Sequence, residues 1–201
     1  MKWLMLVGMA GAATWSFDKD EADKPPAGFE FATTRKTPEG KWLVKKDGEN
    51  KVLAQLDQDK TDGRFAVAVV KESSYKDVSL SVKAKPVSGE VDQAAGLVWR
   101  YKDADNYYLV RSNALEKNVR LYRVVNGKRV QFAGKEEVKL AANEWHALKV
   151  TQKGTSIQVF LNDQKLFEAE DKTFVDAGQV GVWTKADSVT YFDDLTAEEV
   201  K

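Results

Sequence analysis

Hydrophobic and polar residues alternate with a period of two along most of the chain from Trp42 onward. This alternation is typical of strands that bury one face, because successive side chains of a strand point to opposite sides. The segments with this pattern are Trp42–Lys45, Val52–Gln55, Phe65–Val70, Val78–Ala84, Ala95–Tyr101, Tyr107–Asn113, Val119–Val125, Arg129–Ala133, Trp145–Thr151, Ser156–Leu161, Lys165–Ala169, Gln179–Trp183 and Val189–Glu198.

Turn-forming pairs separate several of these segments. Asn126-Gly127 is the strongest short-range signal for a hairpin, and Lys153-Gly154 and Asn162-Asp163 favour two more tight turns. Only Lys71–Tyr75 and Asp171–Val175 are expected to form short helical turns. Many short strands joined by tight turns predict an all-β fold, a sandwich of two antiparallel sheets whose inner faces form the core.

The alternation also predicts which side chains face that core. In Ala95–Tyr101, the residues Leu97, Trp99 and Tyr101 share one side of the strand, whereas Arg100 lies on the other. The residues that we expect to point inward are Leu97, Trp99, Tyr108, Val110, Leu148, Val150, Val159 and Leu161.

Arginine and aromatic side chains gather on the opposite phase of neighbouring strands. A guanidinium without a partner is too costly to bury, so Arg100, Tyr107 and Arg111 should lie on a solvent-facing sheet surface. The next strand adds either Arg120 with Tyr122 or Arg123. Such a row is a candidate floor for a sugar or carboxylate ligand, because aromatic faces stack on apolar ligand faces and guanidinium groups donate to oxygens. The alternative is an exposed face held together by cross-strand Arg–Tyr and Arg–carboxylate contacts.

The charge balance argues against several classes of protein. The 201 residues, a length that suits one domain, include 31 Lys plus Arg and 31 Asp plus Glu, so the basic surface typical of nucleic-acid binders is missing. The sequence has no cysteine, which excludes disulfides, thiolate catalysis and cysteine-based zinc sites.

The first residues, MKWLMLVGMAGAAT, combine one lysine with an apolar run that ends in small residues. We therefore predict a signal peptide over residues 1–14, with cleavage near Ala10-Gly11-Ala12, and a periplasmic or secreted domain over residues 15–201. A packed N-terminal segment or a misassigned start codon is the alternative. The run is too short to cross a bilayer, and no other apolar run approaches about 20 residues. Trp15–Lys36 is polar and is expected to be an extended lead-in.

Several motifs resemble a known family when they are taken in order. They are GKWLV at 40–44, VLAQ at 52–55, DQAAGLVWRY at 92–101, DNYYLVR at 105–111, Asn113, EKN at 116–118, GQVGVWTKAD at 178–187 and FDDL at 192–195. From Trp15 to Lys201 the chain resembles the concanavalin-A-like jelly rolls of the laminin-G type. Within these it is similar to the bacterial 3-keto-disaccharide hydrolase domains, which are described as family-16 glycoside hydrolase-like. The resemblance implies a sugar-related role and a concave ligand face, although the same fold hosts lectins, glycosidases and adhesion modules.

One motif of the family-16 endoglucanases is incomplete. Those enzymes place a nucleophile and an acid/base on one strand in a Glu-x-Asp-x-(x)-Glu pattern. Glu90 and Asp92 supply the first two carboxylates, but Ala94 or Ala95 stands where the second glutamate belongs. A retaining mechanism needs two carboxyl groups about 5 to 5.5 Å apart, so catalysis through this motif is not expected.

Polar residues after the Tyr107–Asn113 strand form a candidate rim. Asn113, Glu116 and Asn118 have turn formation as their alternative role. The family resemblance favours a ligand rim, with Glu116 as the best lone carboxylate for acid/base catalysis. Trp183 lies on the opposite phase from Val182, and its place on the ligand surface follows from the resemblance. We add Asp187 to the candidate ligand-binding residues.

Two further kinds of site are weaker candidates. The single histidine, His146, shares a face with Leu148 and Val150 and is expected at the edge of the core. A calcium ion could bind where the N- and C-terminal strands meet, because Ca²⁺ prefers oxygen ligands. Its candidate ligands are Asp18, Asp20, Asp193 and Asp194, with turn formation as their alternative role.

Three functions remain open. The first is an exported, monomeric jelly roll that binds a carbohydrate or glycoside on its concave sheet. The second is a hydrolase or lyase of modified disaccharides, in which Glu116, Asp187 or a bound cation supplies catalysis. The third is a surface interaction module without a small ligand. A buried carboxylate pair or metal would favour the enzyme, an open aromatic face the binding domain, and a concavity blocked by Arg–Glu pairs the interaction module.

Overall fold

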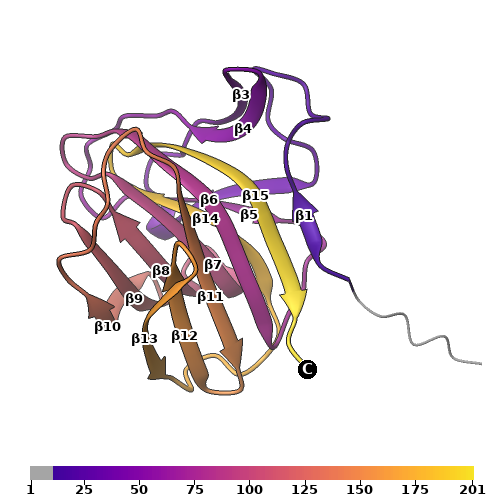
Figure 1. Ribbon diagram of the computed structural model, residues 1–201, viewed down its shortest axis with the longest axis vertical. Coiled ribbons are helices and arrows are strands. Elements are labelled where there is room, and N and C mark those ends of the chain that lie inside the picture. Colours follow the sequence, from indigo (N-terminus) through magenta and orange to yellow (C-terminus); the bar gives the residue numbers. More distant parts are fainter. Residues whose placement is uncertain (1–10) are drawn as a thin grey trace, which may run out of the picture.

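The computed structural model describes residues 11–201, which form two antiparallel sheets packed face to face (Figure 1). The strands of the eight-stranded sheet are, in spatial order, β13 (Gln164–Glu170), β12 (Ser156–Leu161), β11 (His146–Lys153), β6 (Val78–Ser88), β15 (Val189–Glu199), β4 (Asn50–Gln55) and β3 (Trp42–Asp47), with β1 (Ala13–Trp15) beside β15. Those of the seven-stranded sheet are β10 (Lys128–Lys135), β9 (Asn118–Val125), β8 (Asn106–Asn113), β7 (Ala94–Asp103), β14 (Gln179–Lys185), β5 (Phe65–Val70) and β2 (Phe29–Thr33). The predicted two-sheet sandwich is confirmed.

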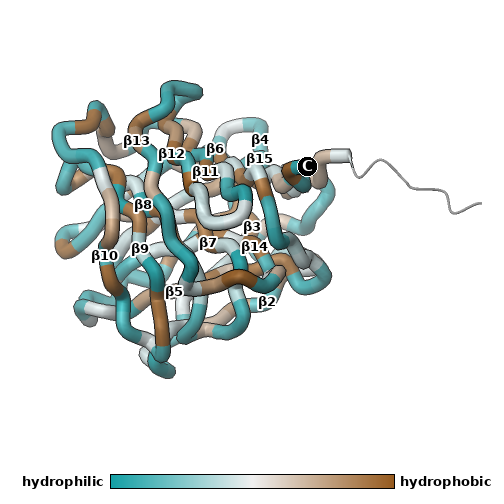
Figure 2. The backbone as a smooth tube through the Cα atoms, turned by 90° about the horizontal axis from the view of Figure 1, so that it is seen from below, coloured by the Kyte–Doolittle hydropathy of each residue, from teal (hydrophilic) through white to brown (hydrophobic). Residues whose placement is uncertain are grey.

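The core between the sheets contains all eight residues that were expected to point inward. Trp99 and Leu97 of β7 are fully buried there, opposite Leu148 and Val150 of β11. Figure 2 shows hydrophobic and hydrophilic residues interspersed along the strands. The core prediction is therefore confirmed, except that Tyr101 lies on the other face of the sheet.

The predicted turns are present and use left-handed backbone conformations. Asn126 and Gly127 join β9 to β10 with φ values of 50° and 73°. Asn162 and Asp163, at 47° and 64°, join β12 to β13. Asparagine, aspartate and glycine tolerate positive φ better than other residues, which is why these pairs favour hairpins.

The expectation of two short helical turns was wrong. Lys71–Tyr75 and Asp171–Val175 form turns and loops, and the single helical segment within residues 11–201 is the 3-10 turn η1 (Thr34–Lys36). The lead-in Trp15–Lys36 includes the end of β1 and the extended strand β2. Ala13 and Thr14, the last residues of the predicted signal segment, belong to β1 and pair with β15; residues 1–10 of that segment lie outside the described residues. No helix among the described residues is long and apolar enough to cross a membrane.

The seven-stranded sheet is buried on its outer face as well. A second cluster of buried residues lies there, and it includes Val69, Val98, Leu109, Tyr107 and Trp183. Every residue of β5 is buried, as expected for a strand that is covered on both sides. The candidate site lies on this outer face.

Candidate functional site

A row of residues in register crosses the outer face of the seven-stranded sheet. Arg120 of β9 pairs with Arg111 of β8, which pairs with Gly96 of β7, which pairs with Trp183 of β14. Gly96 leaves room for its neighbours, because a Cβ there would lie 3.2 Å from Trp183 Cε3 and 2.8 Å from Leu109 Cδ1. The row therefore brings two guanidinium groups and an indole to one surface.

The contacts of Arg129 show that this face is curved. Its guanidinium carbon lies 4.6 Å from the ring centroid of Tyr122, 4.7 Å from that of Phe65 and 5.7 Å from that of Trp183. Tyr122 is on β9 and Phe65 is on β5, four places away in the strand order. In a flat sheet these strands would be about 19 Å apart. The sheet must therefore curl around Arg129, and its outer face is concave.

Arg111 lies at one side of this concavity and is almost fully buried. Its Nη2 donates to Asn118 Oδ1 at 2.6 Å and to Glu116 Oε2 at 2.9 Å. Its Nη1 lies 4.0 Å from Asp92 Oδ2, and its guanidinium carbon lies 5.8 Å from the ring centroid of Tyr122. These contacts fix the guanidinium plane, yet Nε has no hydrogen-bond partner.

Asp92 is the inner carboxylate of the site and is fully buried. Asn113 Nδ2 donates to its Oδ1 at 2.6 Å, and Lys185 Nζ lies 2.9 Å from its Oδ2. The lysine contact is an ion pair without hydrogen-bond geometry, so Oδ2 lacks a hydrogen-bonded partner. Lys185 also contacts the exposed Asp62 at 2.9 Å, and its pKa is raised because the two carboxylates outweigh the effect of burial.

Three buried polar atoms without hydrogen-bond partners come from this one cluster: Asp92 Oδ2, Arg111 Nε and Arg129 Nη1. Leaving a buried donor or acceptor unpaired costs about 1–3 kcal/mol, and more for charged groups. Of the three, Asp92 Oδ2 has an ion-pair partner in Lys185, whereas the two guanidinium nitrogens have neither an ion pair nor a hydrogen bond at these atoms. The three atoms offer two donors and one acceptor to a polar ligand.

Glu116 stands at the rim and is held in its ionised form. Burial opposes ionisation, but hydrogen bonds from Arg111 and Asn118 and the charges of Arg111 and Arg120 lower the pKa of Glu116 to about 2. A carboxylate with this pKa cannot donate a proton near neutral pH and is a weak base. It can accept hydrogen bonds, so the proposed acid/base role of Glu116 is not supported by its surroundings.

A cavity of about 630 Å³ opens beside Glu116 at the same rim. Its walls come from the turn between β8 and β9 and from the loop that follows β10. Its lining residues are Glu116, Lys117, Glu136, Glu137, Val138, Lys139, Leu140, Ala141 and Glu144. Glu136 also accepts a hydrogen bond from Arg120 at 3.0 Å. The cavity extends the charged rim away from the aromatic part of the concavity.

Several predicted site residues meet as expected. Arg111, Asn113, Glu116 and Asn118 form one connected network with Asp92. Of the two alternatives for β9, the structure selects Arg120 with Tyr122, since Arg123 pairs with Asp171 at 2.6 Å instead.

Tyr107 and Trp183 lie on the predicted face but are fully buried. Trp183 Nε1 donates to the Tyr107 hydroxyl at 3.2 Å, and that hydroxyl also lies 2.8 Å from Thr34 Oγ1 of η1. Burial raises the pKa of Tyr107 to about 12. The prediction that Tyr107 and Arg111 face solvent was therefore wrong, because the curl of the sheet and the chain around η1 cover the face.

Arg100 does not belong to this surface. The pairing of β7 with β8 is interrupted between Trp99 and Asp103, and Arg100 has φ 43°. Its side chain is buried and donates to the carbonyls of Lys76, Gly154 and Phe174. A bulge reverses the facing of later side chains, which explains why Arg100 leaves the outer face and Tyr101 joins it.

Asp187 is a structural residue of the site. Its carboxylate accepts backbone hydrogen bonds from Glu90 at 2.7 Å, Val91 at 3.1 Å and Asp92 at 3.0 Å. Burial opposes ionisation, but these three N–H groups lower the pKa of Asp187. The carboxylate thereby fixes the loop that presents Asp92 and is not free for a ligand.

The candidate calcium ligands are engaged elsewhere. Asp194 pairs with Lys83 at 2.7 Å, Asp193 accepts from Asn50 Nδ2 at 2.8 Å, and Asp20 accepts from the Ala27 N–H at 3.0 Å. Within residues 11–201 no three His, Cys, Asp or Glu side chains are grouped to hold a metal ion. The calcium site at Asp18, Asp20, Asp193 and Asp194 stays a prediction.

The sequence pattern does not single out four residues of the concavity: Phe65, Arg129, Lys185 and Asp92, the last of which belongs to the incomplete Glu-x-Asp motif. Alternation places Phe65 opposite the inward-facing Ala66. No local sequence pattern predicts that Arg129 of β10 contacts rings of β5 and β14, because that contact depends on the curvature of the whole sheet.

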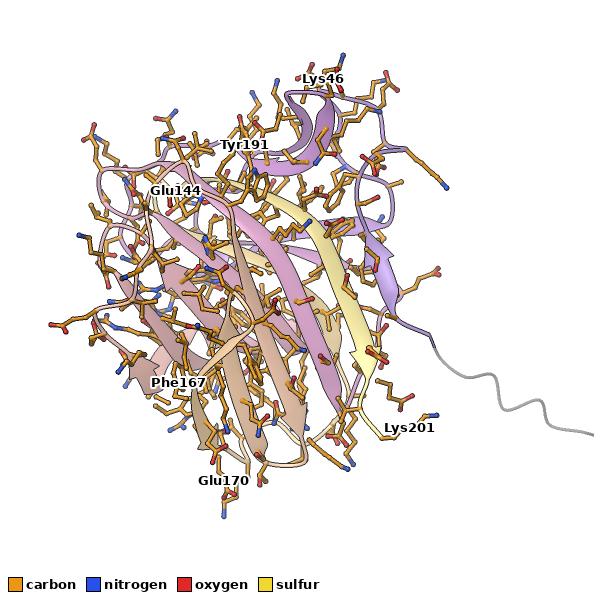
Figure 3. All side chains as sticks on the ribbon, viewed as in Figure 1. Lys46, Glu144, Phe167, Glu170, Tyr191 and Lys201 are labelled. Carbon is orange, nitrogen blue, oxygen red and sulfur yellow. The ribbon has the colours of Figure 1, made fainter. Side chains whose placement is uncertain are left out.

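The outer face of the eight-stranded sheet is a different kind of surface (Figure 3). Lys85 Nζ lies 5.2 Å from the ring centroids of both Trp145 and Tyr191, and 2.5 Å from a carboxylate oxygen of Asp47. None of the unpartnered buried polar atoms comes from these four residues. Of the six unpartnered buried polar atoms among the described residues, three lie on the concave side; the other three are Trp42 Nε1, His146 Nδ1 and Thr184 Oγ1.

Comparison with known proteins identifies the fold. The carbohydrate-binding module CBM66 from Bacillus subtilis superposes with a TM-score of 0.66 and 24% identity, covering 84% of this chain and 95% of the module. The Bacillus licheniformis β-glucanase gives 0.60 with 10% identity, covering 97% of this chain and 100% of the enzyme. A GH16 protein of the Bacteroides ovatus mixed-linkage glucan PUL, in complex with a G4G4G3G product, gives 0.63 with 11% identity, covering 89% and 98%. The predicted concanavalin-A-like jelly roll is confirmed.

The sequence itself has no match among curated proteins. The sequence model of one family matches residues 14–197, nearly the whole of the described chain, and this confirms the resemblance inferred from the motifs. The protein belongs to the family of 3-keto-α-glucoside-1,2-lyase-like domains.

Proposed function

We propose that this protein is a carbohydrate-binding domain that holds a sugar or glycoside on the concave face of its seven-stranded sheet. One observation carries the proposal: Asp92 Oδ2, Arg111 Nε and Arg129 Nη1 are buried together without hydrogen-bond partners. Sugar hydroxyls both donate and accept, so they can satisfy a mixed set of donors and acceptors. The fold shared with a carbohydrate-binding module and with glucanases supports the same reading.

The interaction module without a small ligand is less well supported. Arg–Glu pairs do occupy one edge of the concavity, where Arg111 and Arg120 contact Glu116 at 2.9 and 3.1 Å. In the centre, Asp92 is paired with Lys185, but Arg129 has no carboxylate oxygen of the described residues within 4.0 Å. A face that served only to stabilise the sheet would be expected to satisfy those atoms internally.

A glycan array probed with the labelled protein and with Asp92→Asn tests the proposal. The substitution keeps the size of the side chain but removes the charge of the inner carboxylate. We expect wild-type protein to bind a defined set of glycans, and we expect Asp92→Asn to lose that binding. Asp163→Asn, in an exposed turn, is the matched control and should bind as the wild type does. Absence of any bound glycan, or equal binding by Asp92→Asn, would contradict the proposal.

The family relationship favours lyase or hydrolase activity on 3-keto glycosides as a second candidate. In such a sugar the C–H bond beside the ketone is acidic, and its removal needs a base together with cations near the developing enolate oxygen. Asp92 would take the proton from C2, and Arg111 or Arg129 would stabilise the enolate oxygen. As the enolate collapses, a C1–C2 double bond forms, the C1–O bond breaks, and the leaving oxygen takes a proton from protonated Asp92 or from water. Incubation with a 3-keto-α-glucoside, followed by chromatography, decides the matter: turnover that Asp92→Asn abolishes supports the enzyme, and no turnover supports binding alone.

Export and assembly remain predictions. Mass spectrometry of the mature protein would show whether residues 1–14 are removed, and fractionation would show a periplasmic or secreted location. Size-exclusion chromatography with light scattering tests the expected monomer. Calorimetric titration with Ca²⁺ tests the calcium site at Asp18, Asp20, Asp193 and Asp194.

A further inference from the structure

The guanidinium groups of Arg111 and Arg129 approach the same aromatic ring. Their central carbons lie 5.8 and 4.6 Å from the ring centroid of Tyr122, so both groups lie beside one ring. The pKa of Arg129 is lowered, first by burial, and the positive charge of Arg111 contributes in the same direction. Two cations have therefore been brought together in a partly buried place, at a cost in mutual repulsion.

The carboxylates of the site contact Arg111 and Lys185, and none of them contacts Arg129. Arg111 contacts Glu116 and lies within 4.0 Å of Asp92. Lys185 takes the remaining contact with Asp92 and also pairs with Asp62. Within residues 11–201, Arg129 has no carboxylate oxygen within 4.0 Å and is surrounded by the rings of Phe65, Tyr122 and Trp183.

The unpartnered atoms of these two residues are donors. Arg129 Nη1 and Arg111 Nε are both buried, and neither has a hydrogen-bond partner. A hydroxyl would satisfy one of them without relieving the repulsion between the cations. An oxyanion has several acceptor oxygens, which can pair with both donors and with the charge of Arg129, and guanidinium groups bind carboxylate, sulfate and phosphate oxygens especially well.

We propose that the ligand of the concave face is an acidic sugar, whose oxyanion lies between Arg111 and Arg129 and whose hydroxyls contact Asp92 Oδ2. This inference rests on the proposed function, because it specifies the ligand of the same site. The charge of Asp92 is already balanced by Lys185 and Arg111, so the carboxylate is left to accept from hydroxyls. The oxyanion can belong to a uronate, a sugar sulfate or a sugar phosphate.

Titration followed by NMR of the arginine Nε–H signals tests this inference with defined probes. The probes are glucuronate, glucose 6-sulfate and glucose 6-phosphate, with glucose and the methyl ester of glucuronic acid as uncharged controls. We expect at least one acidic probe to bind about tenfold more tightly than its uncharged control, and to shift the signals of Arg111 and Arg129. The acidic probe that binds most tightly identifies the source of the oxyanion.

Substitution of Arg129 makes the test specific. Arg129→Gln should lose about tenfold in affinity for the acidic probe and change little toward glucose. Arg129→Lys keeps the charge but loses the paired donors of the guanidinium group. Its affinity for the acidic probe should lie between those of wild type and Arg129→Gln. This variant also allows the test if Arg129→Gln does not fold. Arg123→Gln is the matched control, since Arg123 pairs with Asp171 and not with this site.

The outcomes separate this inference from the proposed function. If glucose and the methyl ester bind as tightly as glucuronate, or if Arg129→Gln does not change acidic-probe affinity, the acidic-sugar inference is wrong while carbohydrate binding stands. If inorganic sulfate and phosphate bind as tightly as the acidic sugars, the oxyanion site stands and the sugar contacts are refuted. If neither sugars nor inorganic anions bind, both proposals fail.

Discussion

The carboxylate of Asp187 accepts a hydrogen bond from the backbone N–H of Asp92 at 3.0 Å, and so connects the end of β14 to the loop that carries the inner carboxylate of the site. Asp187 makes no contact with the concavity of its own. Its role is to hold residues 90–92 in place through three N–H groups. The position of Asp92 therefore depends on a residue that is far away in the sequence.

Replacement of Asp187 by asparagine should destabilise the protein by about 1–3 kcal/mol, because the amide can accept fewer of the three hydrogen bonds. Urea unfolding measures this change, with Asp163→Asn as an exposed control that should stay within about 0.5 kcal/mol of wild type. Glycan binding should weaken as well, since Asp92 loses its support. Unchanged stability together with lost binding would instead make Asp187 a ligand residue.

The pH dependence of stability should reflect the lowered pKa of Asp187. An acid that is more easily ionised in the folded than in the unfolded protein stabilises the fold at pH values above its unfolded pKa of about 3.9. That contribution is lost as the pH falls through the lower, folded value. Urea midpoints should therefore decline less steeply below pH 4 in Asp187→Asn than in wild type. Parallel acid profiles would show that the three N–H groups do not stabilise the charge.

Trp99→Ala should cost about 3–5 kcal/mol, because the indole fills the centre of the core between the sheets. Its Nε1 also donates to Gln152 Oε1 of β11, so the substitution leaves a buried amide oxygen without a partner. Trp145, which is 39% exposed, provides the control. If Trp99→Ala unfolds at the same urea concentration as Trp145→Ala, the assigned core is wrong.

Glu116 should remain ionised across the whole physiological range. With its pKa lowered to about 2, the carboxylate signal in a ¹³C NMR titration should not change between pH 4 and pH 8. Its contribution to stability, present above the unfolded pKa of about 4.3, should disappear as the pH falls toward 2. A titration midpoint between pH 5 and 7 would contradict this and would restore Glu116 as a candidate general acid.

Local periodicity was sufficient to predict the sheets, the turns and the side of the sheet on which Arg111, Tyr107 and Trp183 lie. It failed at Arg100, because a bulge with positive φ changes the facing of the chain without any proline or glycine to announce it. It also failed to predict burial of the outer face. That burial comes from the curl of the seven-stranded sheet, which brings Arg129 to Phe65 from opposite parts of the strand order.

Mapping a bound glycan tests most directly whether the ligand lies on the concave face of the seven-stranded sheet. The best glycan from the array would be titrated into isotopically labelled protein, and the shifted NMR signals would be assigned to residues. Binding at the concavity predicts shifts at Arg111, Asn118, Tyr122, Arg129 and the Trp183 indole. Shifts confined to Lys85, Trp145 and Tyr191, on the outer face of the eight-stranded sheet, would contradict the account.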